Sequence, residues 1–199
     1  RVYQEAAAAY VRLQFSASQL PQASNEGKPP AIEVWRDPAR RRLGDELAAL
    51  QAKLSHVDQI LHKAVDASRG IESLRMRGWI LDTHILSLEI RLRQKVLEAF
   101  FHYETAAANA DSDARRQAIM ASWKGIQEAR RLCLVIEQER AERGSLVVAP
   151  LSHAPRQTAA VEKLAAIVSA AVQQVQRGNV APPNRWEDGD LLWRRYLVW

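Results

Sequence analysis

Histidine and acidic side chains are the residues of this sequence that could hold a metal. A di-iron site in a helical bundle needs a Glu and a His three residues apart on two helices, so that both face the same metals. No Glu in the chain has a His three residues after it. The pairs Asp58/His62 and Glu98/His102 are four residues apart and could meet on one helix face. Two such pairs supply too few ligands for a site. The sequence therefore predicts ordinary surface hydrogen bonds there, and neither a metal nor a cofactor.

Nucleophilic chemistry has equally little support. The single cysteine, Cys133, excludes an internal disulfide and an all-cysteine metal site. It stands in the apolar run 132–136, which favours a buried, inert thiol over a nucleophile. The chain has no Gly-x-Ser-x-Gly elbow, and its glycines are scattered rather than gathered before a helix as in a phosphate-binding loop. These observations predict a protein that is not an enzyme.

Several long segments of the chain carry apolar residues at the period of an α-helix. Their ends carry helix start and stop signals, such as Asp37 before Pro38 and the glycines Gly70, Gly144 and Gly178. The expected helices cover about 2–20, 37–70, 71–109, 112–143 and 156–177, with Asp111 or Ser112 capping the fourth and Gly144 closing it. We expect an all-α fold, an elongated antiparallel bundle of about five helices with a central three- or four-helix core and a C-terminal aromatic extension.

Apolar stripes predict which side chains face inward. The second helix carries a heptad seam, formed by Leu43, Leu47, Leu50, Leu54, Val57, Leu61 and Ala64. The stripes of the next three helices comprise Leu81, Ile85, Leu88, Leu92, Ala99 and Tyr103, then Ile119, Trp123, Ile126, Cys133 and Ile136, and finally Val161, Leu164, Val168, Ala171 and Val175.

Residues 86–93 are ambiguous, because leucine and isoleucine alternate there with polar residues as in an amphipathic strand. We favour a helix, since no turn residues flank the stretch and the sequence after it forms helices readily. Gly78 is the candidate position for a kink in this long helix.

The C-terminal end is unusually aromatic. Three of the six tryptophans fall in the last sixteen residues, after the helix-breaking pair Pro182-Pro183. Such a surface can pack on its own bundle or bind another subunit, where Trp, Tyr and Arg dominate the binding energy. The predicted partner-binding residues are Trp186, Leu192, Trp193, Arg194, Arg195, Tyr196 and Trp199. The expected organisation is an N-terminal helix and linker (1–36), a helical bundle (37–178) and a docking tail (179–199).

The charge pattern leaves other partners open. The chain has a net charge of +5, and 22 of its 28 basic residues are Arg. Because 23 acidic residues are mixed with them, we interpret the charges as solvated faces and ion pairs. We therefore expect an accessory or scaffold subunit that binds other protein subunits. The alternatives are a basic helical module that binds nucleic acid and a ligand-sensing four-helix bundle.

The expected location is less constrained. No apolar run is long enough to span a bilayer, although peripheral membrane association is possible. The Arg-rich chain begins at Arg1 without a visible leader. The mitochondrial matrix side is therefore favoured over a bacterial cytoplasm or periplasm.

Overall fold

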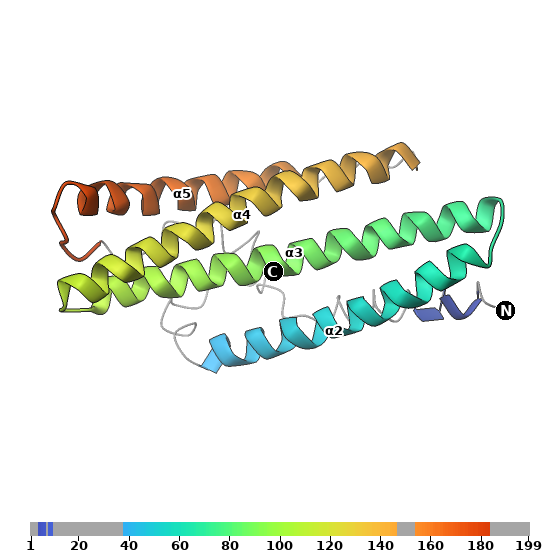
Figure 1. The fold of residues 1–199 in the computed structure, drawn as a ribbon, viewed down its shortest axis with the longest axis horizontal. Helices are drawn as coiled ribbons and strands as arrows, with labels where there is room; N and C mark the ends of the chain where they lie inside the picture. The colour runs from blue at the N-terminus through green and yellow to red at the C-terminus, as the bar shows by residue number, and fades with distance from the viewer. Residues whose placement is uncertain (1–3, 7, 10–37, 147–153, 184–199) are drawn as a thin grey trace, which may run out of the picture. The chain divides into compact units, whose positions relative to one another are not determined.

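The computed structural model describes residues 4–6, 8–9, 38–146 and 154–183, and these residues form α-helices joined by short connections. The helices are α2 (Pro38–Asp66), α3 (Ile71–Ala108), α4 (Ser112–Leu146) and α5 (Ala154–Gln176), and residues 4–6 and 8–9 are also helical (Figure 1). No strand occurs in this described part of the chain. The predicted all-α class is confirmed, and residues 86–93 belong to α3. The predicted linker 21–36 and tail residues 184–199 lie outside the described residues.

Capping interactions define several helix ends. The Asp111 carboxylate accepts a 2.7 Å hydrogen bond from the Ala114 amide, so Asp111 rather than Ser112 caps α4. At the end of α5, Gly178 has a φ of +79°, and its amide donates to the carbonyl of Val175 while Asn179 donates to Gln174. This pair of bonds is a Schellman motif, which requires the left-handed backbone that glycine adopts without strain.

Three predicted boundaries of the described helices differ from the structure by two residues or more. α2 ends at Asp66, four residues before the expected Gly70. α4 continues through Gly144 to Leu146, so the prediction that Gly144 closes this helix was wrong. The positive-φ glycines of the described residues are Gly70 and Gly178, and a glycine without that conformation need not end a helix. α5 begins at Ala154, two residues before the expected start, because Pro155 fits the first helical turn, where no amide donor is needed.

The chain divides into two compact units, and α3 and α4 contribute residues to both. Among the described residues, unit 1 contains residues 4–6, 8–9, 38–90 and 135–146. Unit 2 contains residues 91–134 and 154–183, which include α5. Each unit has its own core.

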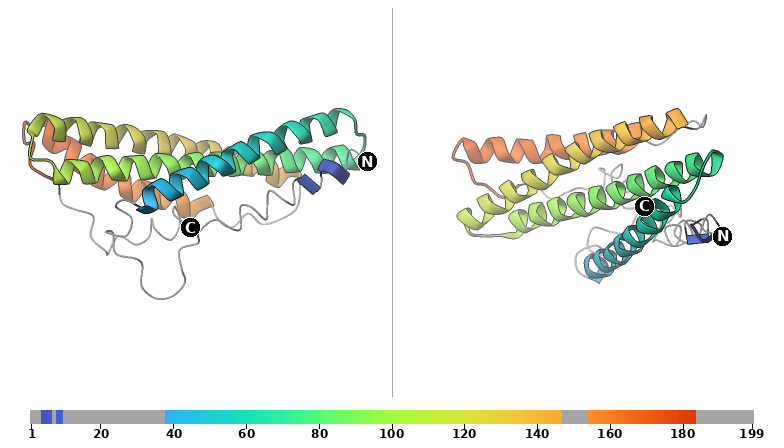
Figure 2. Two further views of the ribbon diagram at one scale, coloured as in Figure 1. Left: turned by 90° about the horizontal axis from the view of Figure 1, so that it is seen from below. Right: turned by 45° about the vertical axis from the view of Figure 1, so that its right-hand side comes forward.

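In unit 1, the turn at 67–70 joins α2 to α3 (Figures 1 and 2). The Gln51 amide on α2 donates a 2.7 Å hydrogen bond to the Ser87 hydroxyl on α3, as antiparallel neighbours can. The heptad seam of α2 is confirmed wherever its side chains are described; the buried members are Leu50, Leu54, Val57, Leu61 and Ala64. The Leu43 and Leu47 side chains lie outside the described residues.

In unit 2, α4 packs on α3 and on α5. All five predicted residues of α5 are buried, as are Leu92, Ala99 and Tyr103 of α3. On α4, Trp123 is only half-buried, whereas the other predicted residues of this helix in the unit are buried. The Arg130 guanidinium bonds the Glu162 carboxylate at 2.7 Å and links α4 to α5.

Candidate functional site

The predicted partner-binding residues, Trp186 to Trp199, lie outside the described residues, so their role stays a prediction. The predicted helix-surface pair is confirmed at Asp58/His62, where the His62 Nδ1 lies 2.9 Å from the Asp58 carbonyl oxygen and 3.4 Å from its carboxylate. Glu98 instead bonds Lys95 at 2.7 Å. The described residues contain no group of three or more His, Cys, Asp or Glu side chains that could hold a metal ion.

Charged residues lie inside the α3–α4 contact of unit 1. The Arg143 guanidinium on α4 donates two hydrogen bonds, of 2.8 and 3.1 Å, to the Asp82 carboxylate on α3. Arg140 pairs with Glu89, and these two side chains are only 11% and 14% exposed. The His84 Nδ1 lies 3.3 Å from the Glu139 carboxylate at the edge of the contact. We call these six residues the polar seam. In the two arginine pairs the residue number rises along α3, from Asp82 to Glu89, as it falls along α4, from Arg143 to Arg140, as in antiparallel helices.

Spacing along α3 explains the position of the polar seam. Gly78, Asp82, Ile85 and Glu89 follow one another in steps of four, three and four, so they share one face of the helix. A Cβ atom at Gly78 would lie 3.3 Å from the Arg143 Cζ atom. The glycine therefore lets the guanidinium of Arg143 lie against the α3 backbone beside Asp82.

Sequence reasoning missed the polar seam as a feature, although it did expect ion pairs. The available signal was the seven-residue spacing of Asp82 and Glu89, which places both on the helix face that carries the buried Ile85. The Asp82 and Glu89 carboxylates accept hydrogen bonds from arginines, so the geometry supports a structural pairing rather than a proton acceptor open to a substrate. Buried pairs of this kind contribute little net stability, because loss of hydration offsets the attraction, and we expect this one to disfavour other registers of the two helices.

In unit 2, a buried arginine ties the start of the C-terminal segment to the α3–α4 turn. The Arg115 guanidinium donates to the carbonyls of Asn109 and Ala110, with a shortest distance of 2.7 Å, and also to the carbonyl of Val180. Pro183, the last described residue, is buried. We call this arrangement the Arg115 clamp. It holds Val180 beside the turn at 109–111.

Arginines are distributed between surface and interior. Arg91 is exposed and Arg93 is buried, as expected for residues on different sides of α3. Arg115 and Arg140 are also buried. Three arginines of the described residues are thus buried within the fold.

Cys133 is buried, as predicted. Within the described residues, no helix is long and apolar enough to cross a membrane. Comparisons of the chain with protein-family models, curated proteins and solved structures found no match.

Proposed function

We propose that this protein is a non-enzymatic accessory or scaffold subunit of a larger assembly, and that residues 184–199 anchor it to a neighbouring subunit. The Arg115 clamp is the observation that carries the proposal. It holds Val180 against the α3–α4 turn, four residues before the proposed anchor begins at residue 184. A segment whose base is fixed loses less conformational entropy when it binds than a freely hanging one.

The composition of the tail supports the same role. Its three tryptophans, its Tyr and its paired arginines belong to the residue types that contribute most to protein interfaces. The polar seam is consistent with a structural protein, because its acids and bases bind one another across a helix contact. The Arg-rich, single-cysteine composition is compatible with the mitochondrial matrix, which remains part of the proposal.

Removal of residues 184–199 tests the proposal. The partner is first identified by purifying the intact protein under native conditions from its source. We expect the truncated chain to keep its helical circular dichroism and its melting temperature, and to lose association with that partner in size-exclusion chromatography. Association should be lost because the aromatic contact area is removed, while the described helices keep their cores.

A matched control separates the tail from general surface changes. Leu134 on α4 is 60% exposed, and Leu134→Gln removes an apolar surface side chain outside the tail. This variant should bind the partner like the intact chain. If the truncated chain instead melts at a clearly lower temperature or aggregates, the tail packs on its own helices and the anchor proposal is overturned.

A further inference from the structure

Two large aliphatic side chains are exposed on the first turn of α3. Ile71 is 66% exposed and Leu74 is 48% exposed. They are three residues apart, so their side chains are neighbours on the helix surface. The turn at 67–70, which joins α2 to α3 at one end of the helix pair, lies directly before them (Figure 2).

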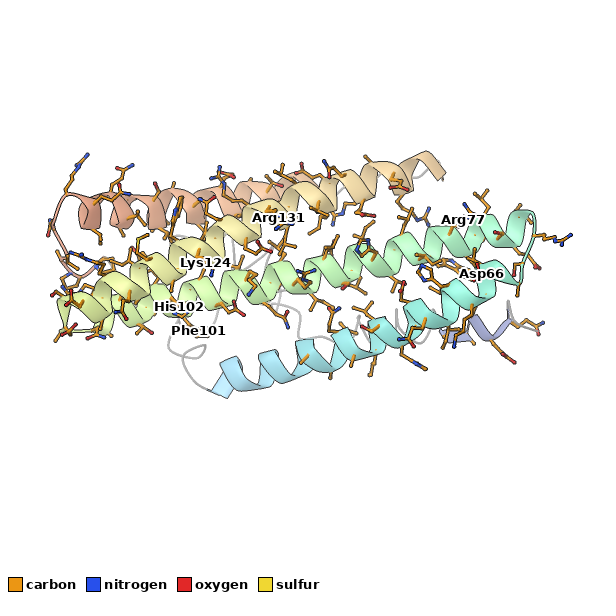
Figure 3. All side chains as sticks on the ribbon, in the orientation of Figure 1. Asp66, Arg77, Phe101, His102, Lys124 and Arg131 are labelled. Atoms are coloured by element: carbon orange, nitrogen blue, oxygen red, sulfur yellow. The ribbon has the colours of Figure 1, made fainter. Side chains whose placement is uncertain are left out.

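Arginines stand on both sides of this aliphatic pair. Successive residues are about 100° apart around the helix axis. Arg75 therefore lies about 40° from Ile71 on the side away from Leu74, and Arg77 lies about 60° from Leu74 on the side away from Ile71. Both are exposed, as is Arg69 in the turn. Within the described residues, no ion pair or hydrogen bond occupies any of these three guanidinium groups. Arg77 is labelled in Figure 3, on α3.

Two acidic residues belong to the same region, but they lie away from the aliphatic pair. Glu72 is about 100° from Ile71 and about 160° from Leu74 around the helix. Asp66 is the last residue of α2 (Figure 3). The aliphatic pair is therefore bordered directly by cations.

We propose that this region, the α2–α3 tip formed by Arg69, Ile71, Leu74, Arg75 and Arg77, binds the surface of membranes that contain anionic lipids. Aliphatic side chains that enter the headgroup region, together with cations that attract anionic headgroups, are the two contributions that hold peripheral proteins on such surfaces. The proposal does not depend on the function proposed for the tail.

The size of the tip favours a lipid surface over a protein partner. A stable protein interface buries roughly 800 Å² on each side and needs matching shape. Two aliphatic side chains at the end of a helix pair offer far less area. A lipid surface deforms around a convex tip, and needs only apolar side chains to insert and cations to pair with phosphate.

Vesicle co-sedimentation tests the proposal with the full chain. We expect binding to vesicles of phosphatidylcholine mixed with phosphatidylserine, little binding to vesicles of phosphatidylcholine alone, and weaker binding as salt rises. The double variant Ile71→Gln/Leu74→Gln should lower the apparent affinity about tenfold, because the inserted apolar area is lost. Arg75→Gln/Arg77→Gln should lower it by a similar factor, because two cations are lost.

Matched variants elsewhere on the surface control for composition. Met120→Gln/Leu134→Gln removes two exposed apolar side chains from α4, and Arg91→Gln/Arg116→Gln removes two exposed arginines. Neither pair belongs to the tip, so both variants should bind vesicles like the intact chain.

Three results would overturn the proposal. The first is the absence of binding to the phosphatidylserine vesicles. The second is an equal loss of binding in the tip variants and their controls, which would mean that net charge or general surface composition governs the interaction. The third is a large drop in melting temperature for Ile71→Gln/Leu74→Gln, which would mean that another part of the chain covers the pair.

Discussion

At the residue scale, the polar seam places a buried ion pair between two helices. Replacing one partner by an apolar residue leaves a charge in the contact without its counterion. Replacing both partners by apolar residues leaves no buried charge. The Glu89–Arg140 pair is therefore expected to matter more as a constraint on helix register than as a source of stability.

Single and double substitutions should separate these effects. Arg140→Met should lower the free energy of unfolding by about 2–4 kcal/mol, and adding Glu89→Leu should restore most of that loss. Urea denaturation monitored by circular dichroism measures both. As a control, Lys95→Met in the exposed Lys95–Glu98 pair should cost less than about 1 kcal/mol. A double variant as unstable as Arg140→Met alone would contradict this interpretation.

A second residue, Tyr103, is expected to make the stability of the protein depend on pH. Burial raises the pKa of its hydroxyl above the ordinary value of 10.0, and the nearby Glu104 carboxylate raises it further. The unfolded chain therefore ionises at lower pH than the folded chain. The contribution to stability is complete below pH 10.0, the ordinary value, and is lost as pH rises through the higher folded pKa.

Tyr103→Phe removes this titration. The free energy of unfolding of the intact chain should fall more between pH 9 and pH 11, a range of about one unit either side of the ordinary tyrosine pKa, than that of the variant. Urea unfolding at several pH values measures the free energy of unfolding of both proteins. The contributions of the other ionisable groups cancel in the difference between them. Parallel pH profiles for the two proteins would show that Tyr103 ionises alike in both states.

At the element scale, α3 is buried on more than one side. Leu88, Ile90 and Leu92 are all buried, although residues two apart point about 200° apart around a helix. The alternation of apolar and polar residues at 86–93, which is typical of a strand, therefore arises here because the helix packs against neighbours on different faces. Helix propensity and the lack of flanking turn residues were sufficient to predict a helix rather than a strand.

The α3–α4 contact of unit 2 depends on small side chains. The Ser122 hydroxyl donates a buried 2.8 Å hydrogen bond to the Ala99 carbonyl. A Cβ atom at Gly125 would lie 3.0 Å from the Ala99 Cβ and 3.3 Å from the Lys95 carbonyl oxygen. The two backbones thus approach more closely at this point than larger residues would permit.

Gly125→Val should destabilise the protein by about 1–3 kcal/mol, because the added methyl groups must push α3 and α4 apart. Adding Ala99→Gly should recover part of the loss by removing the nearest atom. Thermal and urea unfolding measure both effects. Gln127→Val, at an exposed position of α4, controls for the lower helix propensity of valine and should cost less than about 1 kcal/mol. Equal losses for Gly125→Val and Gln127→Val would contradict the close approach.

At the scale of the whole molecule, composition overstates the charge available to partners. The net charge is +5, but several arginines point inward: Arg140 and Arg143 bind carboxylates, and Arg115 binds backbone carbonyls. The guanidinium groups of the α2–α3 tip, which have no ion-pair or hydrogen-bond partner among the described residues, are therefore more informative about surface interactions than the total count. One of the inward-pointing arginines, Arg115, binds the carbonyl of Val180, four residues before the proposed anchor at 184–199.

The sequence by itself determined the helices, most of their boundaries and the apolar stripes of α2 and α5, because capping and periodicity depend on residues within a few positions of one another. Only the tertiary structure decided that Asp82 meets Arg143, that Gly125 meets Ala99 and that Arg115 reaches Val180. These contacts join residues far apart along the chain. They depend on the register between helices, which no local pattern specifies.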